Sequence, residues 1–460
     1  MSANDGIDDL ASQILSSHLT RQELLRRGAA LGISVTGLAA LLDAAPALGA
    51  SDSAYQLEVN REVSGDVTVI FNAGAGVEQG AWDARSAAFM KKFPNVNVKP
   101  AHADGTFYDI VPKVLTLIAG GQAPDVVRTG NYTTAEFGVR DALVPLNSLI
   151  KNDGTLNWND FVPRARGAMT VGGQVYALPE NNETYGIHYN SDLFKAKGLP
   201  DPRKLEDQGK WTKAAFLKAA QALTSGSGAG KKFGFLYETW NSENWIFFNN
   251  GAVLAPDGKT VLVDKPASVN ALQFAADLTN KYGVSPNAQE LAGRTPQELF
   301  LGGTCAMFLT GGWGIADLSK ASFKYGTVGA PRFVGTKPIS KMEISGYAIT
   351  KQSKNQEAAW EYIKFITGPV GQSIWTVTGM PSRQSVINQF AAGKAPGSKY
   401  AAYYKPFLAT LPNARWTPFV AKSAEVAQDL TSATAPMWLG SQTAQEACSK
   451  LSSQLRSLLK

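Results

Sequence analysis

The spacing of apolar residues between positions 65 and 130 predicts an α/β domain. Residues 67–71 (VTVIF) form a β-branched run that leads into a glycine-containing stretch, the pattern of a buried strand followed by a loop. Apolar residues at helical spacing over 82–93 predict a helix, and Val96–Val98 predicts a second strand. A helix over 107–119, stopped by two glycines, and a strand over 124–128 follow. This alternation is typical of a parallel sheet.

The second half of the chain continues with both strands and helices. It predicts a strand over 186–190, a helix with Thr212 as its N-cap, a Gly/Ser surface loop over 224–230, and a helix over 268–282. A short apolar strand over 305–309 runs into a glycine-rich stretch with Trp313. Helical patterns over 355–367 and 421–459 make the last hundred residues largely helical.

Composition and charge limit the functional classes. The 460 residues suffice for two or more domains, and 18% charged residues are ordinary for a globular protein. A net charge of +6 without a continuous basic stripe leads us to expect no nucleic-acid partner.

Motifs for catalysis or metal binding are missing from the sequence. Only His18, His102 and His188 are present, with no His-Glu-x-x-His spacing and no Gly-x-Ser-x-Gly elbow. The stretch 225–232 resembles a phosphate-binding loop but starts with Ser225 and has Lys232 after its lysine. We therefore expect no catalytic residues, no cofactor and no metal.

The N-terminal segment has the pattern of an export signal. A basic stretch with Arg21, Arg26 and Arg27 precedes an apolar run over 28–42 and then small residues up to position 50. Residues 20–26 resemble a twin-arginine motif, except that Gln22 replaces the second arginine. We expect an export signal over 1–50 and a periplasmic location, with the export route left open; the alternative is a buried helix with a basic flank.

The two cysteines carry little information on their own. Cys305 and Cys448 are far apart in the sequence, and such residues are more often small buried apolar groups than a disulfide. Neither lies near the N-terminus, where a lipid-modified cysteine would have to stand.

The order of five segments resembles the extracellular sugar-binding proteins of ABC transporters, the solute-binding family 1 that includes maltose-binding protein. The segments are 89–96 (FMKKFPNV), 121–127 (GQAPDVV), 176–179 (YALP) with 189–194 (YNSDLF), 300–313 (FLGGTCAMF, then GW), and 346–365 (GYAI, then EAAWEYIKF). Each is weak alone. Together, in this order, they cover residues 65 to 440.

The resemblance implies an α/β, two-lobed periplasmic-binding-protein fold of type II, with a ligand cleft between lobes joined by a hinge. The N-terminal lobe would hold residues 55–182 and 313–368, and the C-terminal lobe 183–312 and 369–460. Ligand would bind in the cleft, and the lobes would close on it. The implied partners are a small molecule, most simply a carbohydrate, and the permease subunits of an ABC transporter. We expect a monomer.

Candidate ligand-binding residues stand where the family places its cleft. They are polar or aromatic, apart from one glycine that lets backbone N–H groups approach a ligand closely. Amides and carboxylates bind sugar hydroxyls, and aromatic rings stack on the apolar sugar face. The candidates are Asn72, Glu78, Asn131, Tyr132, Asn181, Asn182, Glu183, Trp240, Asn241, Gly312, Trp313, Tyr347 and Arg383. Trp245 is expected to pack in the core instead, and Trp313 either stacks on ligand or wedges the hinge.

Three alternatives remain open at this point. The same fold can bind a glycerophosphodiester, a polyol or a polyamine. An exported glycoside hydrolase would use paired carboxylates, for which Glu180, Glu183 and Glu243 are available. A chemoreceptor partner would use the same lobes.

Overall fold

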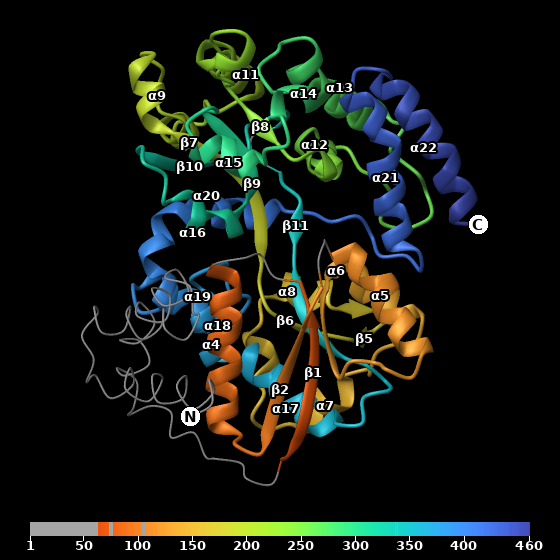
Figure 1. Cartoon of the computed structure of the whole chain (residues 1–460). Coiled ribbons are helices and arrows are strands. Elements are labelled where there is room, and N and C mark those ends of the chain that lie inside the picture. The colour runs from red at the N-terminus through yellow and green to blue at the C-terminus, as the bar shows by residue number, and fades with distance from the viewer. Residues whose placement is uncertain (1–62, 73–76, 104–106, 336, 338) are drawn as a thin grey trace. The chain divides into compact units, whose positions relative to one another are not determined.

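The computed structural model describes residues 63–72, 77–103, 107–335, 337 and 339–460 (Figure 1). The expected export signal over 1–50 lies outside the described residues. The chain forms two compact units. The first unit contains the described residues up to Asn182 together with Ile344–Ala401, and the second contains Glu183–Glu343 and Ala402–Lys460.

The unit boundaries differ in part from those expected. The chain first changes unit between residues 182 and 183, as expected. The two later changes follow Glu343 and Ala401, whereas they were expected after residues 312 and 368. Residues 325–329 pair with the first strand of the second unit, and this pairing keeps the 313–343 stretch in that unit. Helices over 369–375 and 384–391 pack within the first unit, which displaces the third change of unit.

The first unit is built on a five-stranded sheet with the order β2-β1-β3-β12-β6. Its strands are β1 (Gly65–Phe71), β2 (Val96–His102), β3 (Val126–Gly130), β6 (Leu178–Pro179) and β12 (Ser345–Ile349), with a separate hairpin of β4 (Thr170–Val171) and β5 (Gln174–Val175). β2, β1 and β3 are parallel, and β12 is antiparallel to both β3 and β6. The carboxyl ends of β1 and β3 therefore share an edge with the start of β12.

Helices cover the sheet of the first unit. They are α4 (Val77–Lys92), α5 (Phe107–Ala119), α6 (Asn131–Val139), α7 (Asn147–Asn152), α8 (Pro163–Ala168), α17 (Gln356–Ile366), α18 (Pro369–Trp375) and α19 (Gln384–Ala391), with short 3-10 turns at Trp158–Asp160 and Pro396–Tyr400. α4, α17 and α18 pack against one another, and their aromatic residues Trp82, Phe89 and Trp375 join the core.

The second unit has a sheet with the order β10-β7-β9-β8, and β11 pairs with the start of β7. Its strands are β7 (Glu183–Asn190), β8 (Leu236–Tyr237), β9 (Met307–Gly311), β10 (Tyr325–Gly329) and β11 (Met342–Glu343). β7 is antiparallel to β9, whereas β8 is parallel to β9. The start of β7 and the ends of β8 and β9 thus lie at one edge.

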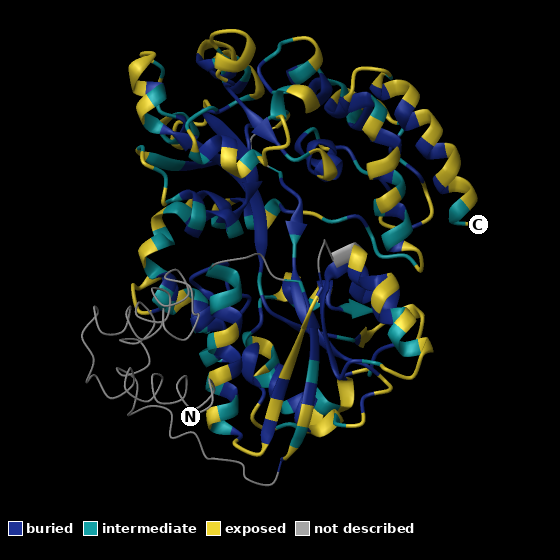
Figure 2. Ribbon diagram, in the orientation of Figure 1, coloured by how far each residue is buried: buried dark blue, intermediate teal, exposed yellow. Residues whose placement is uncertain are grey.

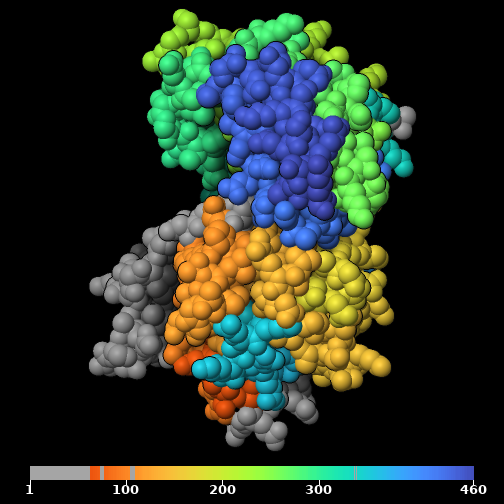
Figure 3. All heavy atoms as spheres, turned by 90° about the vertical axis from the view of Figure 1, so that its right-hand side faces the viewer, coloured from red at the N-terminus to blue at the C-terminus, as the bar shows by residue number. Residues whose placement is uncertain are grey.

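Helices surround this second sheet as well. They are α9 (Ser191–Ala196), α10 (Pro202–Asp207), α11 (Lys213–Leu223), α12 (Ser242–Phe248), α13 (Pro266–Asn280), α14 (Ala288–Leu291), α15 (Pro296–Leu301), α16 (Ile315–Leu318), α20 (Ala401–Thr410), α21 (Ser423–Trp438) and α22 (Ala444–Leu458), with 3-10 turns at Gly228–Gly230, Thr239–Asn241, Gly312–Gly314 and Leu411–Asn413. Figure 3 shows the blue α21 and α22 lying beside the green α13, with which they share a core.

Burial follows the predicted pattern in both units. The central strands are dark blue in Figure 2, and most helices show one buried and one exposed face. Thr212 is the N-cap of α11 as predicted, because its hydroxyl accepts from the Ala215 N–H at 3.3 Å. Cys305 and Cys448 are buried and unpaired. In the described part of the chain, no helix combines the length and apolarity that a bilayer crossing requires.

Candidate functional site

Candidate residues of the first unit lie at the edge where β1 and β3 end. Asn72 follows β1, and Asn131 and Tyr132 open α6 directly after β3. The Asn131 N–H donates to the Ile344 carbonyl at 2.9 Å, which ties the start of α6 to the residue before β12. The parallel register of β1 and β3 explains why residues nearly sixty positions apart meet here.

Three amide side chains in this unit have buried atoms without hydrogen-bond partners. Within the described ranges, neither side-chain atom of Asn131 finds a partner, and the same is true of the amide oxygens of Asn72 and Asn182. Asn131 is 1% exposed and Asn182 is 4% exposed. An unsatisfied buried amide group costs about 1–3 kcal/mol, so a native protein keeps one where a ligand or ordered water completes it.

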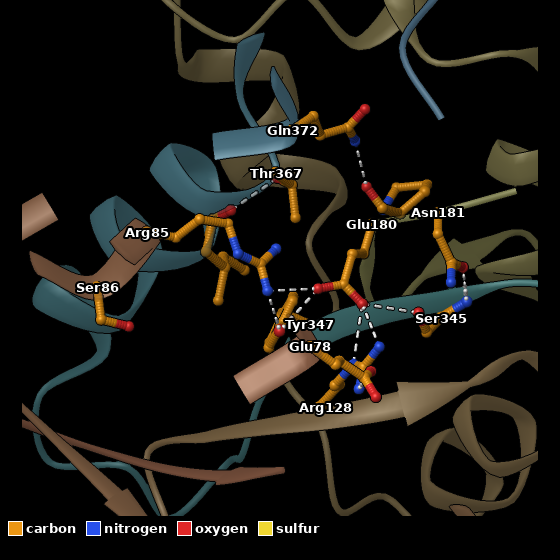
Figure 4. Close-up of polar contacts among 12 residues, drawn as sticks. Glu78, Arg85, Ser86, Arg128, Glu180, Asn181, Ser345, Tyr347, Thr367 and Gln372 are labelled. Atoms are coloured by element: carbon orange, nitrogen blue, oxygen red, sulfur yellow. Dashed lines mark hydrogen bonds and ion pairs between the residues drawn. The ribbon is translucent and has the colours of Figure 1, made fainter. Parts of the chain in front are cut away.

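A buried ion cluster supports the same edge (Figure 4). Glu180 lies between two arginines: its carboxylate is 2.7 Å from Arg85 Nη2 and 2.8 Å from Arg128 Nη2. Arg128 also reaches Glu78 at 2.8 Å and the Asn72 carbonyl at 2.5 Å. The hydroxyl of Tyr347 donates to Glu180 at 2.8 Å. Arg128 thus holds the backbone of Asn72 and the side chain of Glu78, which are both candidate residues.

Electrostatics keep this cluster ionised. Burial alone would raise the pKa of Glu180, but attraction by Arg128 and Arg85 outweighs burial and lowers the pKa to about 2. Burial works against the charge of Arg128 in the same way, and its acidic neighbours nevertheless raise its pKa. The Arg85 guanidinium lies 3.9 Å from the centre of the Trp375 ring, a cation–π contact.

Arg85 was not among the candidate residues, and Glu180 was considered only as a carboxylate of the alternative hydrolase. The sequence did contain a signal for Arg85, because it stands on the apolar stripe of its helix with Trp82 and Phe89. A charge on such a stripe needs a buried counter-charge. Nothing in the sequence identifies Glu180 as that partner.

Three other candidates have partners inside the first unit. Asn181 accepts from the Ser345 N–H at 2.7 Å, and Tyr347 is fully buried in the ion cluster. Arg383 is 2% exposed and donates to the Thr367 carbonyl at 2.7 Å and the Asn157 carbonyl at 3.1 Å. The sequence suggested that the Arg383 side chain would be open to a ligand. The structure buries it, and its hydrogen bonds join two loops instead.

Candidates of the second unit gather where β7 begins and β9 ends. Gly312 leaves room for Glu183, since a Cβ at this glycine would stand 2.4 Å from the Glu183 carboxylate. Trp313 is partly exposed, and its ring meets Tyr185 edge-on with 5.2 Å between ring centres. Tyr185 in turn donates to Glu343 at 3.3 Å.

A second buried charge cluster connects this region to Trp240. Lys341 Nζ lies 2.6 Å from Glu343 and 3.3 Å from Glu243, and it stands 5.9 Å from the centre of the Trp240 ring. Trp240 is 42% exposed. Asn241 beside it is 5% exposed, and its amide oxygen lacks a partner among the described residues. Trp245, by contrast, packs in the core as predicted.

The chemistry of both regions is therefore similar. The charges of the two clusters are paired with one another, while amides and exposed aromatic rings remain for other contacts. No group of three or more histidine, cysteine or acidic residues lies together as a metal site in the residues that the structure describes.

Comparisons with known proteins identify the class. Residues 72–373 match the model of the bacterial extracellular solute-binding proteins, and the chain belongs to this family. A mannitol-binding protein of Pseudomonas aeruginosa is 26% identical over 320 residues, which cover 65% of this chain and 66% of that protein. The chain thus matches just under two thirds of that relative's length.

Solved structures show the same fold. An ABC substrate-binding protein from Listeria monocytogenes in complex with cycloalternan has a TM-score of 0.77 at 21% identity, covering 86% of this chain and 99% of that one. UgpB from Mycobacterium tuberculosis in complex with glycerophosphocholine has a TM-score of 0.75 at 20% identity, covering 86% and 98%. The predicted α/β, two-lobed periplasmic-binding-protein fold and the predicted family are confirmed.

Proposed function

We propose that this protein is exported and captures a neutral, polyhydroxylated solute, a sugar or oligosaccharide, for an ABC transporter. The observation that carries the proposal concerns four of the candidate residues, whose side-chain amides have at least one buried atom without a partner in the described residues: Asn72, Asn131, Asn182 and Asn241. A hydroxyl both donates and accepts, so it satisfies an amide oxygen and an amide nitrogen equally well. Partly exposed Trp240 and Trp313 offer faces for the apolar side of a sugar ring.

Paired charges argue for a neutral solute. The carboxylates of Glu180 and Glu78 balance Arg85 and Arg128, and those of Glu243 and Glu343 balance Lys341. A phosphodiester would require a cation whose charge is not already balanced, and neither cluster offers one. A polyamine would require a carboxylate without an ion pair, and spermidine tests Glu238, which accepts a hydrogen bond from the Thr310 hydroxyl at 3.1 Å. A polyol such as mannitol carries the same hydroxyl groups as a sugar and can bind the same amides, so the proposal includes it.

Hydrolysis of the solute is not part of the proposal. Glu180 is locked between two arginines and its pKa is lowered to about 2, so it is no proton donor near neutral pH. Glu243 pairs with Lys341 and accepts from Thr417. These contacts favour binding without catalysis, as in the family.

Solute capture would involve both units. Candidate residues stand in each unit, and two of them, Asn182 and Glu183, flank the first point at which the chain passes from one unit to the other. We propose that the two lobes close on the solute about these connections and that the loaded monomer then meets the permease subunits. Family membership supports this part.

The test is a thermal-shift screen of the chain from Ser51 onward. The panel contains maltose, maltotriose, mannitol, glycerophosphocholine and spermidine. A solute that binds only the folded state at a hundred times its Kd adds about 2.7 kcal/mol of stability. Stabilisation by a sugar or polyol, without its consumption, supports the proposal. Stabilisation by spermidine or glycerophosphocholine alone overturns the neutral-solute assignment.

Two tryptophan variants locate the site. We expect Trp240→Ala and Trp313→Ala to abolish the solute-induced shift while their own melting temperatures without solute stay within a few degrees of wild type. Trp416→Ala is the matched control, since its ring stacks on Phe419 at 6.0 Å and is only partly exposed. Normal binding by both variants would refute this placement of the aromatic contacts.

A further inference from the structure

His188 is a buried histidine that joins three strands of the second unit and was not a candidate residue. It stands on β7, which lies between β9 and β10 in the sheet (Figure 1). Its Nε2 atom is 3.2 Å from the Gly311 carbonyl oxygen at the end of β9. Its Nδ1 atom is 2.6 Å from the Tyr325 hydroxyl at the start of β10. The side chain is fully buried, and the centre of the Phe407 ring lies 5.4 Å from the centre of the imidazole.

The two hydrogen bonds determine which ring nitrogen carries the proton. A carbonyl oxygen only accepts, so the Nε2 atom of His188 carries a hydrogen and donates it to Gly311. A fully buried imidazolium would need a counter-charge, and both hydrogen-bond partners of His188 are neutral groups. Burial also lowers the pKa of His188 to about 3. The neutral ring therefore has no hydrogen on Nδ1, which accepts from the Tyr325 hydroxyl.

The end of β9 supports the Trp313 ring. A Cβ on Gly311 would stand 2.0 Å from this ring, so the ring lies directly against the Cα atom of the glycine. The ring also meets Tyr185 edge-on, and Tyr185 is the residue of β7 that pairs with Gly311. The position of the Gly311 backbone therefore determines where the partly exposed Trp313 ring lies.

We propose that His188 is a positioning residue of the solute site: its Nε2–H holds the Gly311 carbonyl and, through this glycine, the Trp313 ring. A ring that is held in one place loses less entropy when a solute stacks on it. The effect on solute affinity rests on the proposed function, whereas the effect on the ring is a property of the protein alone.

Two substitutions separate the hydrogen bond to Gly311 from the packing of the imidazole. The amide nitrogen of a glutamine lies about as far along the side chain as Nε2 of a histidine, so His188→Gln can still donate to Gly311. The amide of an asparagine reaches only as far as Nδ1, so His188→Asn can accept from Tyr325 but cannot reach Gly311. Both variants remove a buried ring, and we expect both to melt at a lower temperature than wild type.

The first experiment needs no solute. The chain from Ser51 onward contains only two histidines, His102 and His188, so the ring nitrogens of His188 are assigned in long-range ¹H–¹⁵N NMR spectra by their loss in His188→Gln. We expect a protonated Nε2 and an unprotonated Nδ1 at neutral pH. The opposite tautomer would overturn the proposal, because its Nε2 could not donate to Gly311.

The Trp313 indole N–H signal reports the position of the ring and is assigned by its loss in Trp313→Phe. We expect this signal to shift in His188→Asn and to stay close to its wild-type position in His188→Gln. His102→Gln is the matched control at an exposed histidine, and the buried Trp82 indole of the first unit is the internal reference. An unshifted signal in His188→Asn, or an equal shift in both His188 variants, overturns the positioning role.

The second experiment measures affinity for maltotriose and mannitol by calorimetry at a temperature at which every variant is folded. We expect His188→Asn to bind several-fold more weakly than wild type and His188→Gln to bind with an affinity close to that of wild type. Tyr325→Phe removes a buried hydrogen bond but leaves Nε2 opposite Gly311, so it should lower the melting temperature more than the affinity. Affinities that follow the melting temperatures of the three variants would refute action through Gly311.

The two experiments separate two kinds of failure. If neither probe binds the wild type, the sugar and polyol assignment fails, and the NMR spectra alone decide the positioning role. If a probe binds His188→Asn as tightly as wild type, the part of the inference that concerns affinity is wrong even where the Trp313 signal shifts.

Discussion

At the scale of single residues, the first unit depends on one buried carboxylate. Glu180 is fully buried and neutralises two buried arginines, Arg85 and Arg128, while Ser345 donates to it at 2.8 Å. Breaking a buried ion cluster is costly because the remaining charges lose their compensation without regaining water.

Glu180→Gln is expected to destabilise the protein by about 3–5 kcal/mol, since it keeps the shape but removes the charge between the arginines. Urea denaturation measures the change. Asp66→Asn is the control, because Asp66 and its partner Lys99 are both more than half exposed, and its denaturation midpoint should match wild type. Equal midpoints for the two variants would show that the buried cluster adds no stability.

The pH dependence of stability has a definite sign for Glu180. Its pKa is lowered from 4.5 to about 2, so the unfolded chain binds the proton more readily between these values. The stabilisation is complete above pH 4.5 and is lost as the pH falls through 2. Melting temperatures from pH 6 to 2.5 should fall more steeply for wild type than for Glu180→Gln; parallel curves would contradict this. Burial raises the pKa of Glu238 from 4.5 to about 7, so this residue acts with the opposite sign, at pH values above those at which Glu180 titrates.

Single residues also show what the sequence could and could not predict. Asn131 was a candidate because it follows a predicted strand, and Asn241 because it stands beside Trp240 in a segment where the family places its cleft. The contact of Glu238 with Thr310 was not predicted, because it depends on the register of two strands 72 residues apart, which no local pattern gives. For Arg383 the sequence indicated a loop position, but the contact of its side chain with the Thr367 carbonyl was not predictable.

At the scale of elements, the turn after β9 leaves no room for a side chain at Gly312. A Cβ on Gly312 would stand 2.4 Å from the Glu183 carboxylate and 2.8 Å from the Tyr404 ring. A side chain here must push one of these groups aside, and overpacking of this kind costs about 1–3 kcal/mol.

Gly312→Ala is therefore expected to lower the melting temperature and to weaken solute binding through displacement of Glu183. Thermal denaturation and calorimetry with the solute found in the screen measure both effects. Gly230→Ala is the matched control in the same unit, since nothing lies within 4 Å of a Cβ there. If Gly312→Ala had the melting temperature and the solute affinity of the wild type, the turn would accommodate a Cβ without loss of stability or binding.

Elements with long, regular patterns were predicted best. The helix predicted over 355–367 is α17, and the strand over 67–71 is the main part of β1. The two-residue strands β6, β8 and β11 were missed because they are too short for any periodicity to appear. The helical stretch predicted over 421–459 consists of two helices, α21 and α22. The chain leaves α21 at Leu439 and Gly440, and Gly440 adopts a left-handed φ of +73°.

At the scale of the whole molecule, the chain order complicates prediction. Each unit is built from two separate stretches of sequence, and the later connections differ from those expected because β10 pairs back onto β7. Long-range strand pairing of this kind has no local signal. The resemblance to the family predicted two units, but the places where the chain passes from one unit to the other are known only from the structure.

Closure of the two units on a solute can be tested without knowing their arrangement. If residues of both units bind the same molecule, the bound state gains contacts from each only when the units approach, so binding energy favours the more compact state. Small-angle X-ray scattering should then show a smaller radius of gyration with the solute that stabilises the protein. Trp240→Ala and Trp313→Ala at the same solute concentration should keep the solute-free value. If a solute binds but leaves the radius of gyration unchanged, one unit alone, or lobes that are already closed, must be sufficient for capture. The proposal of hinge closure would then be wrong.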